Sequence, residues 1–125
     1  MARINRVLDH IESHLTEPLP LRELAKVAAF SPYHFHRIFS ALVGETVTQL
    51  VNRRRLARAS TQLVYSPEKA ITDIALDCGF SSPSTFARAF KTSRGCSASQ
   101  WRDEALRKLH EEGAAEEPPE RALRL

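Results

Sequence analysis

Apolar side chains recur three or four residues apart along most of the chain, which is the spacing of amphipathic helices. A first helix is predicted over residues 4–15, and prolines in the segment 17–20 end it before a short second helix at residues 21–28. A third helix begins at Ser31 and Pro32, because serine caps a first turn and proline suits the first helical position. The side chains of these helices expected in the core are Ile4, Val7, Leu8, Ile11, Leu15, Leu21, Leu24, Ala25, Ala28, Phe35, Ile38, Phe39 and Leu42.

A longer fourth helix is predicted after Gly44, from a cap at Thr46 or Thr48 to about residue 64. The remaining helices are expected over residues 71–78, from Ser82 and Pro83 to Gly95, and from Ser97 or Ser99 to about residue 109. Their inward positions, with those of the fourth helix, are Val47, Leu50, Val51, Ala57, Leu63, Ile71, Ile74, Ala75, Cys78, Phe86, Ala89, Phe90, Trp101, Ala105 and Leu109. No segment alternates polar and apolar residues with a period of two, so the predicted fold class is all-α, with about seven helices.

The chain also contains an internal repeat. The pattern of residues 24–31 recurs at residues 74–81, and after one inserted residue the two copies continue in register. The aligned pairs in this second stretch are Phe35 with Phe86, Arg37 with Arg88, Phe39 with Phe90 and Gly44 with Gly95. A repeat of this length usually marks a duplicated supersecondary unit.

In each copy a short helix meets a helix opened by serine and proline across a turn of a few residues, with Phe30 or Phe80 expected to fill the space between them. This is the pattern of a helix-turn-helix, whose second helix enters the major groove of DNA. We therefore expect one folded domain at residues 1–109. It divides into a first unit at 1–45, a linker helix at 46–65 and a second unit at 66–109, and a polar, flexible tail is expected at 110–125.

The length of the linker helix suits two neighbouring sites on one duplex. Roughly 18 residues at 1.5 Å each give about 27 Å, whereas successive major grooves on one face of DNA lie about 34 Å apart. One chain is thus predicted to occupy two adjacent major grooves, with some bending of the DNA.

The charge distribution agrees with a polyanionic partner. The formal net charge is +3, but residues 111–125 carry five glutamates against two arginines, so the rest of the chain is more basic than the total suggests. No apolar run approaches the roughly 20 residues that a membrane span needs, and we expect a cytoplasmic protein with no membrane partner.

Other chemistry finds little support in the sequence. Cys78 and Cys96 do not form a metal-type pair, and Cys78 lies on an apolar stripe. His10 and His14 are one helical turn apart, but no motif supplies further ligands, so no metal site is predicted. No convergent acid, base or nucleophile is present, and we expect neither catalytic residues nor a cofactor: the protein is not predicted to be an enzyme.

The exposed side of the third helix carries the strongest candidate site. Tyr33, His36, Arg37 and Ser40 lie at helical spacing on one stripe opposite the apolar face. Arginine can bond to guanine O6 and N7, and an aromatic or imidazole side chain can contact base edges or a thymine methyl. We expect Tyr33, His36 and Arg37 to read bases, and His34 and Ser40 to contact phosphates.

The sixth helix presents a smaller stripe, on which Ser84, Thr85 and Arg88 are the candidate base-reading residues. The candidate phosphate contacts in this helix and in the linker helix are Arg53, Arg54, Arg58, Lys91 and Thr92. Two alternatives remain open: a merely solvated basic linker helix, and an all-helical protein-interaction module whose basic face binds an acidic partner.

The stretch from Phe30 to Phe39, the glycine after it, and the stretch from Ile74 through Gly79 and Phe80 to Phe90 resemble the AraC/XylS family over about residues 4–104. The resemblance implies a bacterial, cytoplasmic transcription regulator, usually an activator, that binds double-stranded DNA through two helix-turn-helix units and contacts RNA polymerase. It places the base-reading positions on Tyr33, His36, Arg37, Ser84, Thr85 and Arg88.

This chain departs from the family pattern in two places. Pro83 stands where some relatives have a polar base-contacting residue, which implies weaker discrimination by the second unit, and Ala98 replaces a frequent proline, which implies a weaker start to the last helix. Most members carry an effector or dimerisation domain. The chain is expected to be either a compact regulator or, preferably, the N-terminal portion of a longer one with a GyrI-like domain for a small-molecule effector.

Overall fold

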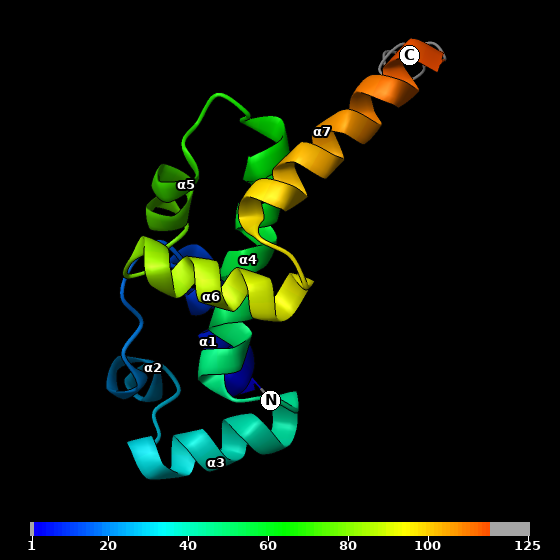
Figure 1. Ribbon diagram of the computed structural model, residues 1–125. Helices are drawn as coiled ribbons and strands as arrows, with labels where there is room; N and C mark the ends of the chain where they lie inside the picture. The colour runs from blue at the N-terminus through cyan, green and yellow to red at the C-terminus, as the bar shows by residue number, and fades with distance from the viewer. Residues whose placement is uncertain (1, 116–125) are drawn as a thin grey trace.

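The computed structural model describes residues 2–115, and in this range the chain is entirely helical (Figure 1). The all-α prediction is confirmed. The seven helices are α1 (Ala2–Ser13), α2 (Leu21–Val27), α3 (Pro32–Val43), α4 (Val47–Tyr65), α5 (Ile71–Asp77), α6 (Pro83–Arg94) and α7 (Ala98–Ala115).

Local side-chain chemistry sets the helix ends at equivalent places in the two repeats. The hydroxyl of Ser31 accepts a hydrogen bond from the backbone N–H of His34 at the start of α3, and Ser82 does the same for Thr85 at the start of α6. Both helices have proline in the first turn and end at a glycine in the left-handed region.

Helices α4 and α7, which follow α3 and α6, begin with the same capping arrangement. At the start of α4, the Thr46 hydroxyl accepts a hydrogen bond from the Gln49 N–H, and the Gln49 side-chain oxygen accepts one from the Thr46 N–H. The capping residue is therefore Thr46 and not Thr48. Ser97 and Gln100 form the same reciprocal pair before α7, at 3.1 Å in each direction. This capping box holds the last helix start that the missing proline was expected to weaken.

Two separate apolar cores lie along the chain. The first is built from α1, α2, α3 and the N-terminal half of α4, around Phe35 and Phe39. The second is built from the C-terminal half of α4 with α5, α6 and the start of α7, around Phe86 and Phe90. The aromatic pairs are equivalent in the repeat, and their ring centres are 5.6 and 5.5 Å apart. Each helix-turn-helix unit therefore has its own core.

The linker helix α4 takes part in both cores with different sides. Val47, Leu50 and Val51 are buried in the first core, whereas Leu56 and Leu63 are buried in the second. At about 100° per residue, the two buried stripes point about 170° apart. This reversal corrects the prediction that Ala57 faces inward: the residue falls between the two stripes and is exposed.

Three other inward positions were also predicted wrongly. Leu21, at the start of α2, is exposed. Leu42 is half exposed, because the last turn of α3 packs Val43 against the core instead. Leu109 is exposed because α7 extends away from the rest of the molecule beyond its first turns (Figure 1). That helix continues to Ala115, past the expected end near residue 109, and Arg107 supports the extension by pairing with Glu104 and Glu111. Residues 116–125 of the predicted tail lie outside the described residues.

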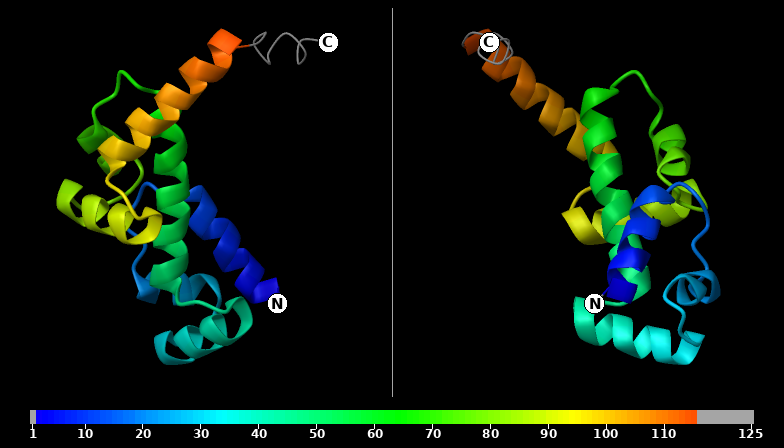
Figure 2. Two further views of the ribbon diagram at one scale, coloured as in Figure 1. Left: turned by 45° about the vertical axis from the view of Figure 1, so that its right-hand side comes forward. Right: turned by 180° about the vertical axis from the view of Figure 1, so that it is seen from behind.

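The arrangement of the helices repeats the order of the sequence. Helices α3 and α6 lie roughly parallel and run in the same direction; α6 crosses in front of α4, and α3 lies below the N-terminal end of α4 (Figure 1). Helix α1 lies on the other side of α4, as the view from behind shows (Figure 2). The two helices predicted to enter DNA grooves are thus arranged one after the other along the linker helix.

Candidate nucleic-acid interface

The exposed row of α3 contains a preformed aromatic and cationic pair. Tyr33 is 68% exposed, the highest value but one among the large apolar side chains in the described residues. The Arg37 guanidinium lies 5.7 Å from the centre of the Tyr33 ring, and its Nη1 donates to the Tyr33 hydroxyl at 3.4 Å. His36 is exposed on the same side of the helix. These three predicted base-reading residues therefore form one accessible surface.

The other two predicted α3 residues have different surroundings. His34 lies at the N-terminus of α3, with Nδ1 3.0 Å from the Ser31 hydroxyl, where free N–H groups favour an anion. Ser40 was expected at the end of the exposed row. Its Oγ is instead buried and has no hydrogen-bond partner among the described residues, because this turn of α3 lies against the body of the unit.

The row on α6 is exposed and lines a groove. Thr85, Arg88 and Thr92 line one wall of a groove of about 490 Å³, and Leu56 and Ala89 contribute apolar surface to it. Ser84 and Lys91 are exposed on the same helix. The Thr85 hydroxyl is 2.9 Å from that of Ser82, so the capping serine holds one of the predicted reading residues.

The opposite wall of this groove comes from α4. Gln49, Asn52 and Arg53 line it, and only Arg53 was predicted from the sequence. Arg53 forms an ion pair with Glu45 at 2.5 Å, and the hydrogen bond to this carboxylate raises the pKa of Arg53. Sequence analysis missed the two neutral residues because an amide on a helix gives no charge signal. Their spacing of three or four residues from Arg53 and Leu56 places all four on one side of the helix, and this spacing could have identified them.

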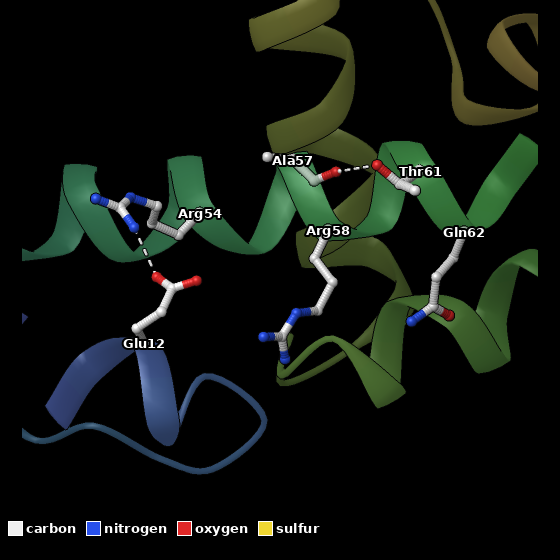
Figure 3. Close-up of a pocket in the computed structure, with 6 residues that line it drawn as sticks. All are labelled: Glu12, Arg54, Ala57, Arg58, Thr61 and Gln62. Atoms are coloured by element: carbon white, nitrogen blue, oxygen red, sulfur yellow. Dashed lines mark hydrogen bonds and ion pairs between the residues drawn. The ribbon is translucent and has the colours of Figure 1, made fainter. Parts of the chain in front are cut away.

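Arg54 and Arg58 lie on another side of α4. Each is about 160° around the helix from Leu56, one of the α4 residues that line the groove. They line a separate pocket with Glu12 of α1, and Arg54 pairs with Glu12 at 2.6 Å (Figure 3). The structure therefore does not bring these two predicted phosphate contacts together with the rows on α3 and α6.

Three other arginines have structural roles at helix ends. Arg3 donates to the carbonyls of Ala28 and Ala29, and its guanidinium covers the Phe30 ring at 3.8 Å. Arg55 donates to two carbonyls after α1, and Arg102 donates to one carbonyl in the last turn of α4 and to two after it. Such bonds satisfy carbonyl groups that helices leave unpaired at their C-termini. These side chains thus hold turns in place and contribute less to the free basic surface.

The turns of the two units have the same backbone hydrogen bonds. In the first, the N–H of Phe30 donates to Ala25 and that of Ala29 to Lys26; in the second, Phe80 donates to Ala75 and Gly79 to Leu76, all at 3.0–3.1 Å. Phe80 is 4% exposed in the second core, and Phe30 packs partly buried against the first. Phe80 is therefore a core residue, as predicted, and Phe30 covers the edge of the first core.

The comparison with known families agrees with this geometry. A family described as a helix-turn-helix domain, of the AraC type, matches residues 24–104, which span both turns and the linker helix. The chain belongs to this family. Membership places it among DNA-binding, helix-turn-helix transcriptional regulators, which are not a class of enzymes.

Individual relatives give the same result. The chain is similar to YbfP of Bacillus subtilis (strain 168), an uncharacterized HTH-type transcriptional regulator, with 41% identity over 88 residues that cover 70% of this chain and 30% of YbfP. The fold is similar to the C-terminal domain of AraT, a response regulator from Geobacillus stearothermophilus, with a TM-score of 0.77, 27% identity, and coverage of 83% of this chain and 86% of that domain.

A second solved structure is the DNA-binding domain of AdpA, a global transcriptional factor, in complex with a target DNA. It shares a TM-score of 0.77 and 27% identity, and the match covers 82% of this chain and 91% of that domain. The chain spans less than a third of the length of the curated relatives that it matches first. Across residues 2–115, none of the helices combines the length and apolar character needed to cross a membrane.

Proposed function

We propose that this AraC-type domain binds specific double-stranded DNA by inserting α3 and α6 into two adjacent major grooves. Tyr33, His36 and Arg37 would read bases in one groove. Ser84, Thr85 and Arg88 would read bases in the next, with less discrimination because α6 offers shorter side chains and begins with Pro83.

The observation that carries this proposal is the parallel, same-direction arrangement of α3 and α6, one beyond the other along the direction of α4 (Figure 1). Helix α4 has 19 residues, or about 28 Å, close to the roughly 34 Å between successive major grooves. The remaining difference is of the size that a moderate DNA bend removes, at a cost of about 1–6 kcal/mol.

Phosphate contacts are assigned according to the side of the molecule on which each residue lies. We propose His34 at the start of α3, Arg53 at the groove, and Lys91 and Thr92 on α6. Gln49 and Asn52 line the same groove and are suited to bonding with the DNA backbone between the two reading helices. Ser40, Arg54 and Arg58 are not included, because their surroundings direct them away from this surface.

Family resemblance supports the wider regulatory role. We propose that the full protein activates transcription through RNA polymerase and that a small molecule controls it through a GyrI-like effector domain outside this chain. The geometry of residues 2–115 supports only the DNA-binding part of this proposal; activation and effector control rest on the family resemblance.

Selection of bound fragments from random duplexes, followed by footprinting, tests the proposal. The expected product contains two half-sites about one helical turn apart, both protected on one face of the DNA. Equal affinity for selected and scrambled duplexes, or protection of a single groove, would contradict it.

A further inference from the structure

Gly79, in the turn of the second unit, lies against the first unit. A β-carbon at this position would be 2.1 Å from the carbonyl oxygen of Leu15 and 2.7 Å from Nε of Arg55. Leu15 lies in the turn after α1 and belongs to the first core, whereas Gly79 follows α5 of the second unit. The two units therefore meet directly at this point, with only the hydrogen of a glycine between them.

Arg55 connects the two sides of this contact. From the middle of α4 its Nε donates to the Leu15 carbonyl at 2.9 Å, and its Nη2 donates to the Glu17 carbonyl at 2.8 Å. Burial lowers the pKa of Arg55, which agrees with a guanidinium enclosed between the units. The linker helix, the turn after α1 and the turn after α5 are thus joined at one place, here called the junction and made of Leu15, Arg55 and Gly79.

The internal repeat separates the role of this glycine from the needs of the turn. The equivalent position in the first unit is Ala29, which has the same backbone hydrogen bonds and a positive φ of 59°. The first turn therefore forms with a β-carbon present. Ala29 is exposed, whereas Gly79 is in close contact with the first unit. Two factors therefore favour glycine at position 79: the left-handed backbone, with φ of 100°, and the contact, which leaves no room for a side chain.

We propose that the junction fixes the distance and relative orientation of α3 and α6, and so determines which half-site separation the protein accepts. This proposal rests on the proposed two-groove binding. A methyl group at 79 would force the Leu15 carbonyl and the turn apart by about 1 Å, because close-packed contacts yield little. The second unit would then depend more on α4 for its position, and the rigid relation between the reading helices would loosen.

The test compares Gly79→Ala with Gly95→Ala. Gly95 is also in the second unit and has a φ of 82°, but a β-carbon there meets nothing within 4 Å, so the control carries the backbone strain without the collision. Affinity is measured for duplexes carrying both half-sites at the selected separation, for duplexes with one base pair added or removed, and for each half-site alone. One base pair changes the separation by about 3.4 Å and rotates one half-site by about 35°.

The wild-type protein and Gly95→Ala are expected to prefer the selected separation over its neighbours by about tenfold or more, because the second unit binds intramolecularly only when the geometry fits. Gly79→Ala is expected to lower that preference to about threefold or less, or to move it to another separation, while affinity for single half-sites stays within about twofold of Gly95→Ala. Equal separation profiles for Gly79→Ala and Gly95→Ala would overturn the proposal.

A second pair of variants decides the matter if Gly79→Ala does not fold. Arg55→Met removes the bonds to the Leu15 and Glu17 carbonyls without changing the turn, and Arg102→Met removes a similar set of carbonyl bonds inside the second unit. Arg55→Met should broaden the separation profile and Arg102→Met should not; identical profiles would again overturn the proposal. Absence of specific binding by the wild-type protein would instead contradict the proposed function itself.

Discussion

Replacing Arg37 with alanine is the most direct test of base reading. The only interactions of its side chain among the described residues are with Tyr33, through a 3.4 Å hydrogen bond and a 5.7 Å cation–ring contact, and both residues are exposed. The free energy of unfolding should therefore change by less than about 0.5 kcal/mol. A guanidinium that bonds to guanine in the groove contributes about 1–3 kcal/mol of discrimination, so affinity for the selected duplex should fall by roughly 5- to 150-fold.

The assay is fluorescence anisotropy on a selected duplex, a scrambled duplex and a set with each base pair changed in turn. Arg37→Ala should lose most affinity on the selected duplex and become indifferent to one base position. Arg37→Lys keeps the charge but not the planar fork, so it should retain affinity for scrambled DNA and still lose discrimination. Arg54→Ala is the matched control. It also removes one arginine charge, but from the side of α4 that faces away from the groove. An equal loss on selected and scrambled duplexes after Arg37→Ala would refute direct reading by this residue.

Three further predictions concern other parts of the molecule. Arg53→Ala should weaken binding to all duplexes about equally and reduce the slope of log K against log salt by about 1, whereas Arg54→Ala should leave the slope unchanged; equal slopes for both variants would contradict the assignment by side. Thr46→Ala should lower the free energy of unfolding by about 0.5–2 kcal/mol in urea titrations, because it removes the hydroxyl that accepts the hydrogen bond from the Gln49 N–H. At pH 8, iodoacetamide should modify half-buried Cys96 well before Cys78, which is fully buried and whose thiol pKa is raised by burial; mass spectrometry of the folded protein would show the order.

Local signals were enough to predict most of the helix boundaries. Ser31 and Ser82 cap helices that begin with proline, and glycines follow the ends of the same helices, so each boundary depends on residues within one turn of it. The end of α7 was underestimated because polar composition was interpreted as fraying. The pairing of Arg107 with acidic residues on either side supports that helix instead.

The faces of α4 could not be predicted in the same way. One helical stripe was expected along its whole length, and this placed Ala57 inward and Arg54 with the DNA-facing residues. The reversal of the buried side depends on which helices cover each half, and this is a property of tertiary packing. For the same reason the exposed row of α3 was correct at Tyr33, His36 and Arg37 but not at Ser40, whose turn lies against the rest of the unit.

The opposed buried sides of α4 also bear on how this molecule can change over evolutionary time. The two clusters of buried residues have no member in common within the described part of the chain. A cavity-forming substitution at Phe86 should therefore speed amide hydrogen exchange in the later turns of α4 and leave the protection of its early turns nearly intact. Away from the junction, substitutions in one core are therefore expected to leave the packing of the other core intact.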